Sequence, residues 1–256
     1  MQFSYLVVEG PHDAEFIGRL LRLSGLRKLR KIEDLAAYWR PTIPSTFPYR
    51  GDLLTRVPVP VFFQSATHSI AVHSAGSISR LVPTVEETFA ILGAKRAEIS
   101  SIGIFLDADW QIPIPNTFAR LKAEIEAVSL ATPERPGTVN QNGVRTGIFI
   151  FPDNHKPGTL EDLLDECAAL IYPELRKNAQ QFTTGAATAA LTKKERREFE
   201  KPAGRLKATM GCVANFLKPA KAIQNSIEDN RWLCSESLAL DNISKLDNFL
   251  KVLVGL

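Results

Sequence analysis

The sequence has few cysteines, and their spacing does not suggest a metal site or a disulfide framework. The three cysteines, Cys167, Cys212 and Cys234, are far apart and form no CxxC pair. An odd number of scattered cysteines argues against both zinc and disulfide bonds, so we expect reduced thiols. The four histidines show neither HxH nor HExxH spacing. This argues against the histidine-based zinc motifs.

Long apolar runs and nucleotide-binding loops are also missing. The first apolar run stops at Glu9 and has no basic segment before it. It is too short for a signal peptide or a membrane span, so we expect a cytoplasmic protein that does not bind a membrane. No GxxxxGK[ST] loop occurs. Any ATP hydrolysis would therefore have to come from another chain.

The composition is that of an ordinary folded protein, with 45% hydrophobic and 23% charged residues and no repeat. A net charge of +3 says little by itself about nucleic acid. Basic residues outnumber acidic ones between 176 and 221, however, and are densest at Lys193, Lys194, Arg196 and Arg197. This cluster could contact a nucleic acid or form a solvated helix face.

Apolar runs alternate with helical periodicity through the first 170 residues. Strands are expected over 3–8, 69–73, 101–106 and 146–151, and a capped helix begins at Thr159. This alternation predicts an α/β fold with a parallel sheet flanked by helices. Residues 27–60 are rich in proline and look like an insertion. We expect an α/β domain over 1–170 and an all-helical C-terminal extension over 171–256.

Acidic side chains follow three of the expected strands: Glu9 the first, Asp107 and Asp109 the central one, and Asp153 the last, with Glu161 in the next helix. Open α/β sheets bind ligands beyond the carboxyl ends of their strands. A divalent cation would offset the repulsion between carboxylates gathered there. Oxygen ligands favour Mg²⁺ or Mn²⁺ over zinc, and Mg²⁺ often shares its shell with phosphate. The pattern therefore points to phosphoryl chemistry.

Two segments resemble motifs of a known family. Glu9-Gly10-Pro11-His12-Asp13 resembles the first motif of Toprim domains, and residues 104–109 (IFLDAD) resemble the second, the DxD strand. Through 147–154 and 158–163, the sequence is similar to a small bacterial Toprim-like family without assigned function. It more distantly resembles the Toprim domains of OLD-family nucleases. The resemblance covers about residues 1–170 and implies a Toprim-like, Rossmann-like sheet.

The resemblance also implies roles for individual residues. Glu9 would act as an acid/base or as a metal ligand, and Asp107 and Asp109 would hold Mg²⁺. Asp13 and Glu161 would help to bind a first or second ion. A simpler explanation for Glu9 is an acid placed favourably at a helix N-terminus.

Three further candidates follow the last strand. Asp153 and Asn154 would support the ligands, although the same residues could form only an Asx turn. Lys156 could reach a phosphate or remain solvated. Asp162 is better explained as a helix-capping residue than as a ligand.

These inferences predict a Mg²⁺-dependent nuclease that acts on DNA or RNA. The sequence departs from topoisomerases, which commonly have a third acid where Gln111 stands, and from primases, which commonly have a glycine near there. Two alternatives are a non-catalytic module that binds metal or nucleic acid, and primase-like nucleotidyl transfer. The sequence leaves open the type of nucleic acid, the number of ions, the oligomeric state and any protein partner.

Overall fold

The strands form one mixed sheet. The computed structural model describes residues 1–46, 59–108, 110–186 and 190–256. Within these ranges the sheet has seven strands in the order β2-β3-β4-β1-β5-β7-β6. The four neighbouring strands at its centre are parallel: β4 (His68–Ser74), β1 (Gln2–Val8), β5 (Ile99–Asp107) and β7 (Arg145–Phe151). The predicted α/β fold with a parallel sheet is confirmed.

Short antiparallel strands complete the sheet at both sides. β3 (Val61–Gln64) pairs with β4, β2 (Arg27–Lys28) pairs with β3, and β6 (Val139–Asn140) pairs with β7. Strand β2 belongs to the predicted insertion. In the same segment the buried Trp39 donates a hydrogen bond of 3.1 Å to Oγ of Ser69. The described part of the insertion is therefore anchored to the sheet, and its residues 47–58 lie outside the described ranges.

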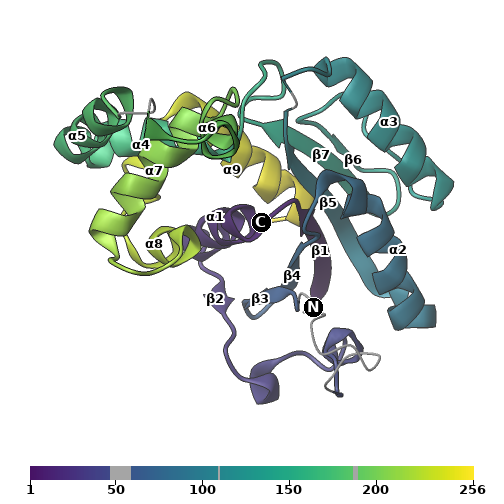
Figure 1. The fold of residues 1–256 in the computed structure, drawn as a ribbon. Helices are drawn as coiled ribbons and strands as arrows, with labels where there is room; N and C mark the ends of the chain where they lie inside the picture. The colour runs from purple at the N-terminus through teal and green to yellow at the C-terminus, as the bar shows by residue number, and fades with distance from the viewer. Residues whose placement is uncertain (47–58, 109, 187–189) are drawn as a thin grey trace.

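Helices cover both faces of the sheet (Figure 1). The α-helices are α1 (Pro11–Leu23), α2 (Leu81–Leu92), α3 (Ile114–Ala127), α4 (Leu160–Ile171), α5 (Pro173–Thr184), α6 (Lys193–Phe199), α7 (Gly204–Leu217), α8 (Ile223–Asp229) and α9 (Asp241–Val254). Short 3₁₀ helices span 32–34, 40–42, 78–80, 93–98 and 237–239. Within the described ranges no helix has the length and apolarity needed to cross a membrane.

The central strands are apolar throughout because both of their faces are buried. In β1, Leu6 and Val8 join a core that includes side chains from α1, α4, α7 and α9. The alternate residues Tyr5 and Val7 join the other core, which α2 and α3 complete. The helices on both sides of residue 170 share the first core, and the predicted domain boundary there stays a prediction.

Helix α9 packs closely against the sheet at two glycines. Gly103 of β5 and Gly147 of β7 are register partners. A Cβ atom on Gly103 would lie 2.5 Å from Cδ2 of Leu253, and one on Gly147 would lie 2.7 Å from Cζ of Phe249. Glycine at these positions lets the helix lie closer than any side chain would permit.

Arg145 fixes the last turn of α9. Its Nε donates a hydrogen bond of 2.8 Å to the carbonyl of Leu253, and its Nη2 donates one of 3.0 Å to the carbonyl of Val254. These carbonyls have no partner within the helix. Nη2 also donates to Oε1 of Gln2. One side chain of β7 thus joins the first strand to the final helix.

Candidate functional site

Two of the predicted site residues lie at strand ends on the same edge of the sheet. Strands β1 and β5 are parallel neighbours, and Val8 is the register partner of Phe105. Glu9 follows β1 directly, and Asp107 is the last residue of β5. Both carboxylates therefore stand at the carboxyl edge of the central strands. Asp109, the second acid of the DxD motif, lies outside the described residues.

Asp107 is tied to the start of helix α4. The backbone amide of Ala108 donates to the carbonyl of Gly158 at 3.0 Å, which holds the loop before α4 against the end of β5. The amide of Leu160, the first residue of α4, donates a hydrogen bond of 2.8 Å to Oδ1 of Asp107. The positive end of the helix thus faces this carboxylate.

The residues before α4 explain how the start of this helix lies so close to Asp107. A Cβ atom on Gly158 would lie 2.8 Å from Cδ of Pro152, so only glycine fits there without a shift. The amide of Thr159 donates a hydrogen bond of 2.7 Å to Oδ2 of Asp162. Asp162 thus caps the helix, as the simpler explanation of this residue expected. The buried hydroxyl of Thr159 faces the same first turn, where the two residues form a capping box.

Asp13 and Glu161 bring two more carboxylates to this edge. Asp13 lies in the first turn of α1 and is 7% exposed, and its Oδ2 accepts a hydrogen bond of 2.6 Å from the amide of Gly10. Glu161 lies in the first turn of α4 and is 4% exposed. The two helix N-termini favour negative charge here. Glu9, Asp13, Asp107 and Glu161 are therefore close enough to influence one another's ionisation.

A lysine that the sequence did not single out lies among these acids. The ammonium of Lys207, on α7, is 2.6 Å from Oε2 of Glu161 and 3.8 Å from Oδ2 of Asp107. About half of its side chain, 48%, is exposed. The only signal for Lys207 in the sequence was its place in the basic segment 176–221. The packing of α7 against α4 sets its position, and the sequence alone does not reveal that packing.

Burial and mutual repulsion make ionisation of the cluster unfavourable. The pKa of Asp107 is raised to about 7, mainly by burial and also by the charges of Glu161 and Glu9, although Lys207 and the Leu160 amide act in the opposite direction. Burial also raises the pKa of Glu9, against a backbone hydrogen bond at Asp107 that lowers it. The cluster thus holds negative charge at an energetic cost that an added cation would reduce.

Asp13 is affected in the same direction. Burial raises its pKa well above the usual range, and the charges of Asp107, Glu9 and Glu161 raise it further. His12, its neighbour in the sequence, is half-buried at the same place. Burial lowers the pKa of His12, although the charge of Glu161 acts in the opposite direction, and the shift favours the neutral imidazole.

The other residues predicted near the last strand have structural contacts. Oδ1 of Asp153 accepts hydrogen bonds from the amides of His155 and Lys156 at 2.9 and 2.8 Å, which is an Asx turn. Oδ1 of Asn154 accepts one of 2.8 Å from the amide of Ile150. Lys156 is exposed. The Asx turn considered for Asp153 is thus present, and the supporting and phosphate-binding roles of these residues stay predictions.

Helix α6 presents most of the predicted nucleic-acid-binding residues to solvent. Lys193, Lys194 and Arg197 are exposed, and Arg196 is half-buried. An open groove of about 570 Å³ separates α6 from α7, and Lys207 is part of its lining. Because Lys207 also contacts the acids, α6 borders the acidic site.

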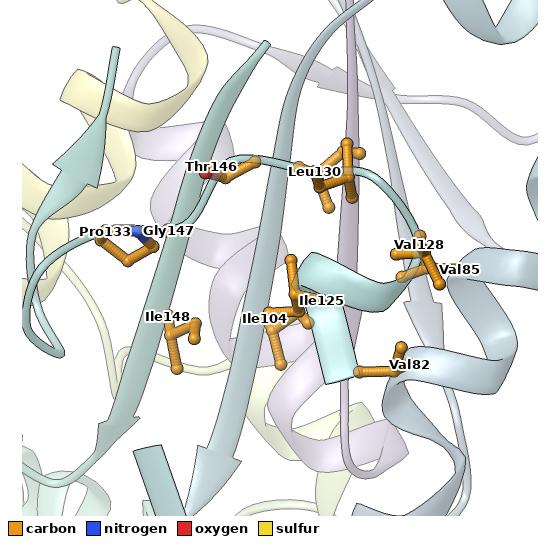
Figure 2. A pocket seen from close by; sticks show the side chains of 11 residues that line it. Val82, Val85, Ile104, Ile125, Val128, Leu130, Pro133, Thr146, Gly147 and Ile148 are labelled. Atoms are coloured by element: carbon orange, nitrogen blue, oxygen red, sulfur yellow. The ribbon is translucent and has the colours of Figure 1, made fainter. Parts of the chain in front are cut away.

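A separate hollow in the second core has the character of a packing gap. It lies between α2, the end of α3 and strands β5 and β7, and its lining is almost entirely aliphatic (Figure 2). Its volume is about 10 Å³. Such a space barely admits one water molecule, and an apolar lining offers that water no partners.

The donor set at the acidic site suits a hard divalent cation. Its carboxylates supply oxygen only, and burial and repulsion raise the pKa of three of them. Within the described ranges, no three His, Cys, Asp or Glu side chains already stand as a group that could hold an ion. The residues fit Mg²⁺ or Mn²⁺ in chemistry, while Lys207 provides the cation in the present arrangement.

Comparisons with other proteins agree with this fold. A family model described as "Protein of unknown function (DUF3226)" matches residues 4–255. The crystal structure of hypothetical protein PH0156 from Pyrococcus horikoshii OT3 is similar, with a TM-score of 0.56 and 16% sequence identity over 99% of this chain and 95% of that chain. At this identity the likeness shows the fold alone. A search of curated proteins gave no match.

Proposed function

The chain belongs to the DUF3226 family, and we propose that it is a Mg²⁺-dependent phosphodiesterase that cleaves DNA or RNA at the acidic site. The observation that carries this proposal is the convergence of four carboxylates at one edge of the sheet, from two strand ends and two helix N-termini. Helix N-termini account for part of this charge, through the amides of Gly10 and Leu160, but not for four acids at one edge. A cation that also binds phosphate would explain it.

Each residue has a part that follows from its position. Glu9 and Asp107, at the strand ends, would hold Mg²⁺ or Mn²⁺ together with Asp109, and Asp13 and Glu161 would contribute from the helices. When bound, the ion supplies stabilisation of the charge that develops on a phosphate oxygen. As the alternative to binding the ion, Glu9 would accept a proton from the attacking water, and burial raises its pKa in the direction that favours this role.

The polyanionic substrate needs positive charge near the acids. Lys207 supplies it within the site, and α6 supplies Lys193, Lys194 and Arg197 at its border. Contacts of this kind hold the phosphate backbone without selecting a base sequence. We therefore propose nucleic acid as the partner and the cytoplasm as the place of action.

One observation favours a second candidate function, binding of metal or nucleic acid without turnover. Lys207 engages Glu161 and faces Asp107, which leaves the acids partly neutralised. A site occupied by its own lysine could bind a phosphate backbone without cleaving it. Primase-like nucleotidyl transfer has no comparable support among the described residues.

The decisive experiment is incubation with labelled single- and double-stranded DNA and RNA, with Mg²⁺ or Mn²⁺, in the presence and absence of nucleotides. We expect shortened products from the wild type and a loss of about a hundredfold or more in Asp107→Asn, since even the partners of metal ligands contribute 10- to 100-fold. Asp241→Asn, at a side chain that is 80% exposed, is the matched control. Extension products would instead indicate a transferase, and binding without any new product would indicate the second candidate.

A further inference from the structure

The contact between Lys207 and Glu161 differs from the ordinary ion pairs on the surface of this protein. In the pairs Lys245–Asp241 and Arg80–Glu87 all four side chains are about half exposed or more. Such pairs contribute little to stability. The side chain of Glu161, by contrast, is only 5% exposed. A buried carboxylate needs a cation close by, and its removal is costly.

The position of Lys207 in its own helix points the same way. It is the fourth residue of α7, which begins at Gly204. The positive end of the helix dipole disfavours a cation in the first turn. The unfavourable position is offset by the acids opposite. The acids opposite Lys207 therefore favour a cation at this position, whereas the helix dipole does not.

The ammonium leaves no space for a metal ion on the same oxygen of Glu161. An ion bound to Oε2 of Glu161 would sit about 2.0–2.1 Å from that oxygen. The ammonium already lies 2.6 Å from the same atom. Two cations cannot share this position, because they would be in contact and would repel each other.

One oxygen of Asp107 has a hydrogen bond, and the other faces a charge. Its Oδ1 accepts the hydrogen bond from Leu160, and its Oδ2 faces Lys207 at 3.8 Å. A pair of ions about 3.5–4 Å apart needs a carboxylate free to bridge them. Asp107 has the central position for that purpose and is already shared with the lysine and the helix.

We propose that Lys207 takes the place of a second cation, so that this site binds one divalent ion instead of two. The inference rests on the proposed function. The ion would be held at the strand ends, by Glu9 and Asp107, while the ammonium neutralises Glu161. A substrate phosphate would then meet one metal ion and one lysine.

The test is the number of Mn²⁺ ions bound per chain, measured by the loss of the free Mn²⁺ signal in electron paramagnetic resonance and by calorimetry. We expect one ion for the wild type and for Lys207→Arg, which keeps the charge. Lys207→Met removes the charge with little change in length, and we expect it to bind two. Lys201→Met is the matched control, because Lys201 pairs with the exposed Glu198 nearby; it should bind one.

Two ions in the wild type would overturn the inference, as would one ion in a folded Lys207→Met protein. If that variant does not fold, Lys207→Gln replaces it, and the wild-type count still decides between one and two. Failure of the proposed function looks different: one ion binds to the wild type, yet no nucleic acid is cleaved. A wild type that binds no ion contradicts both.

Discussion

The amide of Leu160 donates a hydrogen bond to Oδ1 of Asp107, across 53 positions of the sequence. Leu160 is the first residue of α4, and Asp107 is the last residue of β5. This bond orients the carboxylate at the sheet edge and brings the positive end of a helix to it. The distance between the strand end and Glu161 is set by the same contact, because Glu161 follows Leu160 directly.

Replacing Leu160 by proline would remove this hydrogen bond while preserving the helix, because proline is accepted at the first position of a helix. A hydrogen bond to a charged group contributes about 1.5–3 kcal/mol. We therefore expect Leu160→Pro to lose about tenfold or more in Mn²⁺ affinity, measured by calorimetry. Leu160→Ala is the control, since it loses the same buried side chain and keeps the amide. Equal affinities in the two variants would show that the bond does not orient the ligand.

Divalent ions should stabilise the protein by mass action, because a ligand that binds the folded state alone raises the midpoint of thermal unfolding. We expect Mg²⁺ and Mn²⁺ to raise the midpoint of the wild type, and the double variant Asp107→Asn with Asp109→Asn to lose that shift. The double variant should also melt higher than the wild type without metal, because it relieves repulsion among buried acids. A metal response that survives in the double variant would place the ion elsewhere.

The charge of α6 should contribute to nonspecific nucleic-acid binding. Replacing Lys193, Lys194, Arg196 and Arg197 by glutamine should weaken binding of a labelled oligonucleotide and make the dependence of log K on log salt shallower. The loss should be similar for different base sequences. A matched variant removes four basic residues near or on α3, on the other face of the sheet: Lys95, Arg96, Arg120 and Lys122. Equal affinities and slopes for the wild type and the α6 variant would show that α6 is a solvated helix face that does not contribute to binding.

The glycine pair beneath α9 gives a prediction about stability. A methyl group on Gly103 would lie 2.5 Å from Leu253 and 2.9 Å from both Leu6 and Phe105. All three side chains are buried, so none can move aside easily. We expect Gly103→Ala to lower the free energy of unfolding by about 1–3 kcal/mol in urea denaturation.

Gly211→Ala provides the opposite case. Gly211 lies within α7, and a Cβ atom there would meet nothing within 4 Å. Alanine is preferred over glycine within a helix, so this variant should gain up to about 1 kcal/mol. A Gly103→Ala protein as stable as the wild type would mean that α9 can shift away from the sheet.

The part of the fold that the sequence predicts is the part governed by local patterns. The central strands are continuous apolar runs, and a chain that alternates strand and helix places their carboxyl ends at one edge. Glu9 and Asp107 could therefore be assigned to a common site before any coordinates. The antiparallel strands β2 and β6 have two residues each, too short for any periodic signal.

Lys207 marks the limit of such reasoning at the site. Its contacts with Glu161 and Asp107 exist because α7 packs against α4, and no local pattern of residues encodes that packing. The sequence does not reveal the close packing of α9 on Gly103 either, because that contact also depends on tertiary packing. A glycine within a strand indicates that something approaches, but not which helix does so.

The contacts of Arg145 with Gln2 and Val254 join three segments that are far apart in the sequence. While the chain is being synthesised, the sheet face that carries Gly103, Phe105 and Phe149 has to wait for α9, which begins only at Asp241. Until then, a ribosome-bound chain displays aromatic and aliphatic side chains to water, the condition in which nascent proteins aggregate or recruit chaperones. The completing step also joins residues far apart in sequence, which slows it. We therefore expect the chain to aggregate most readily in the interval between the synthesis of β7 and that of α9.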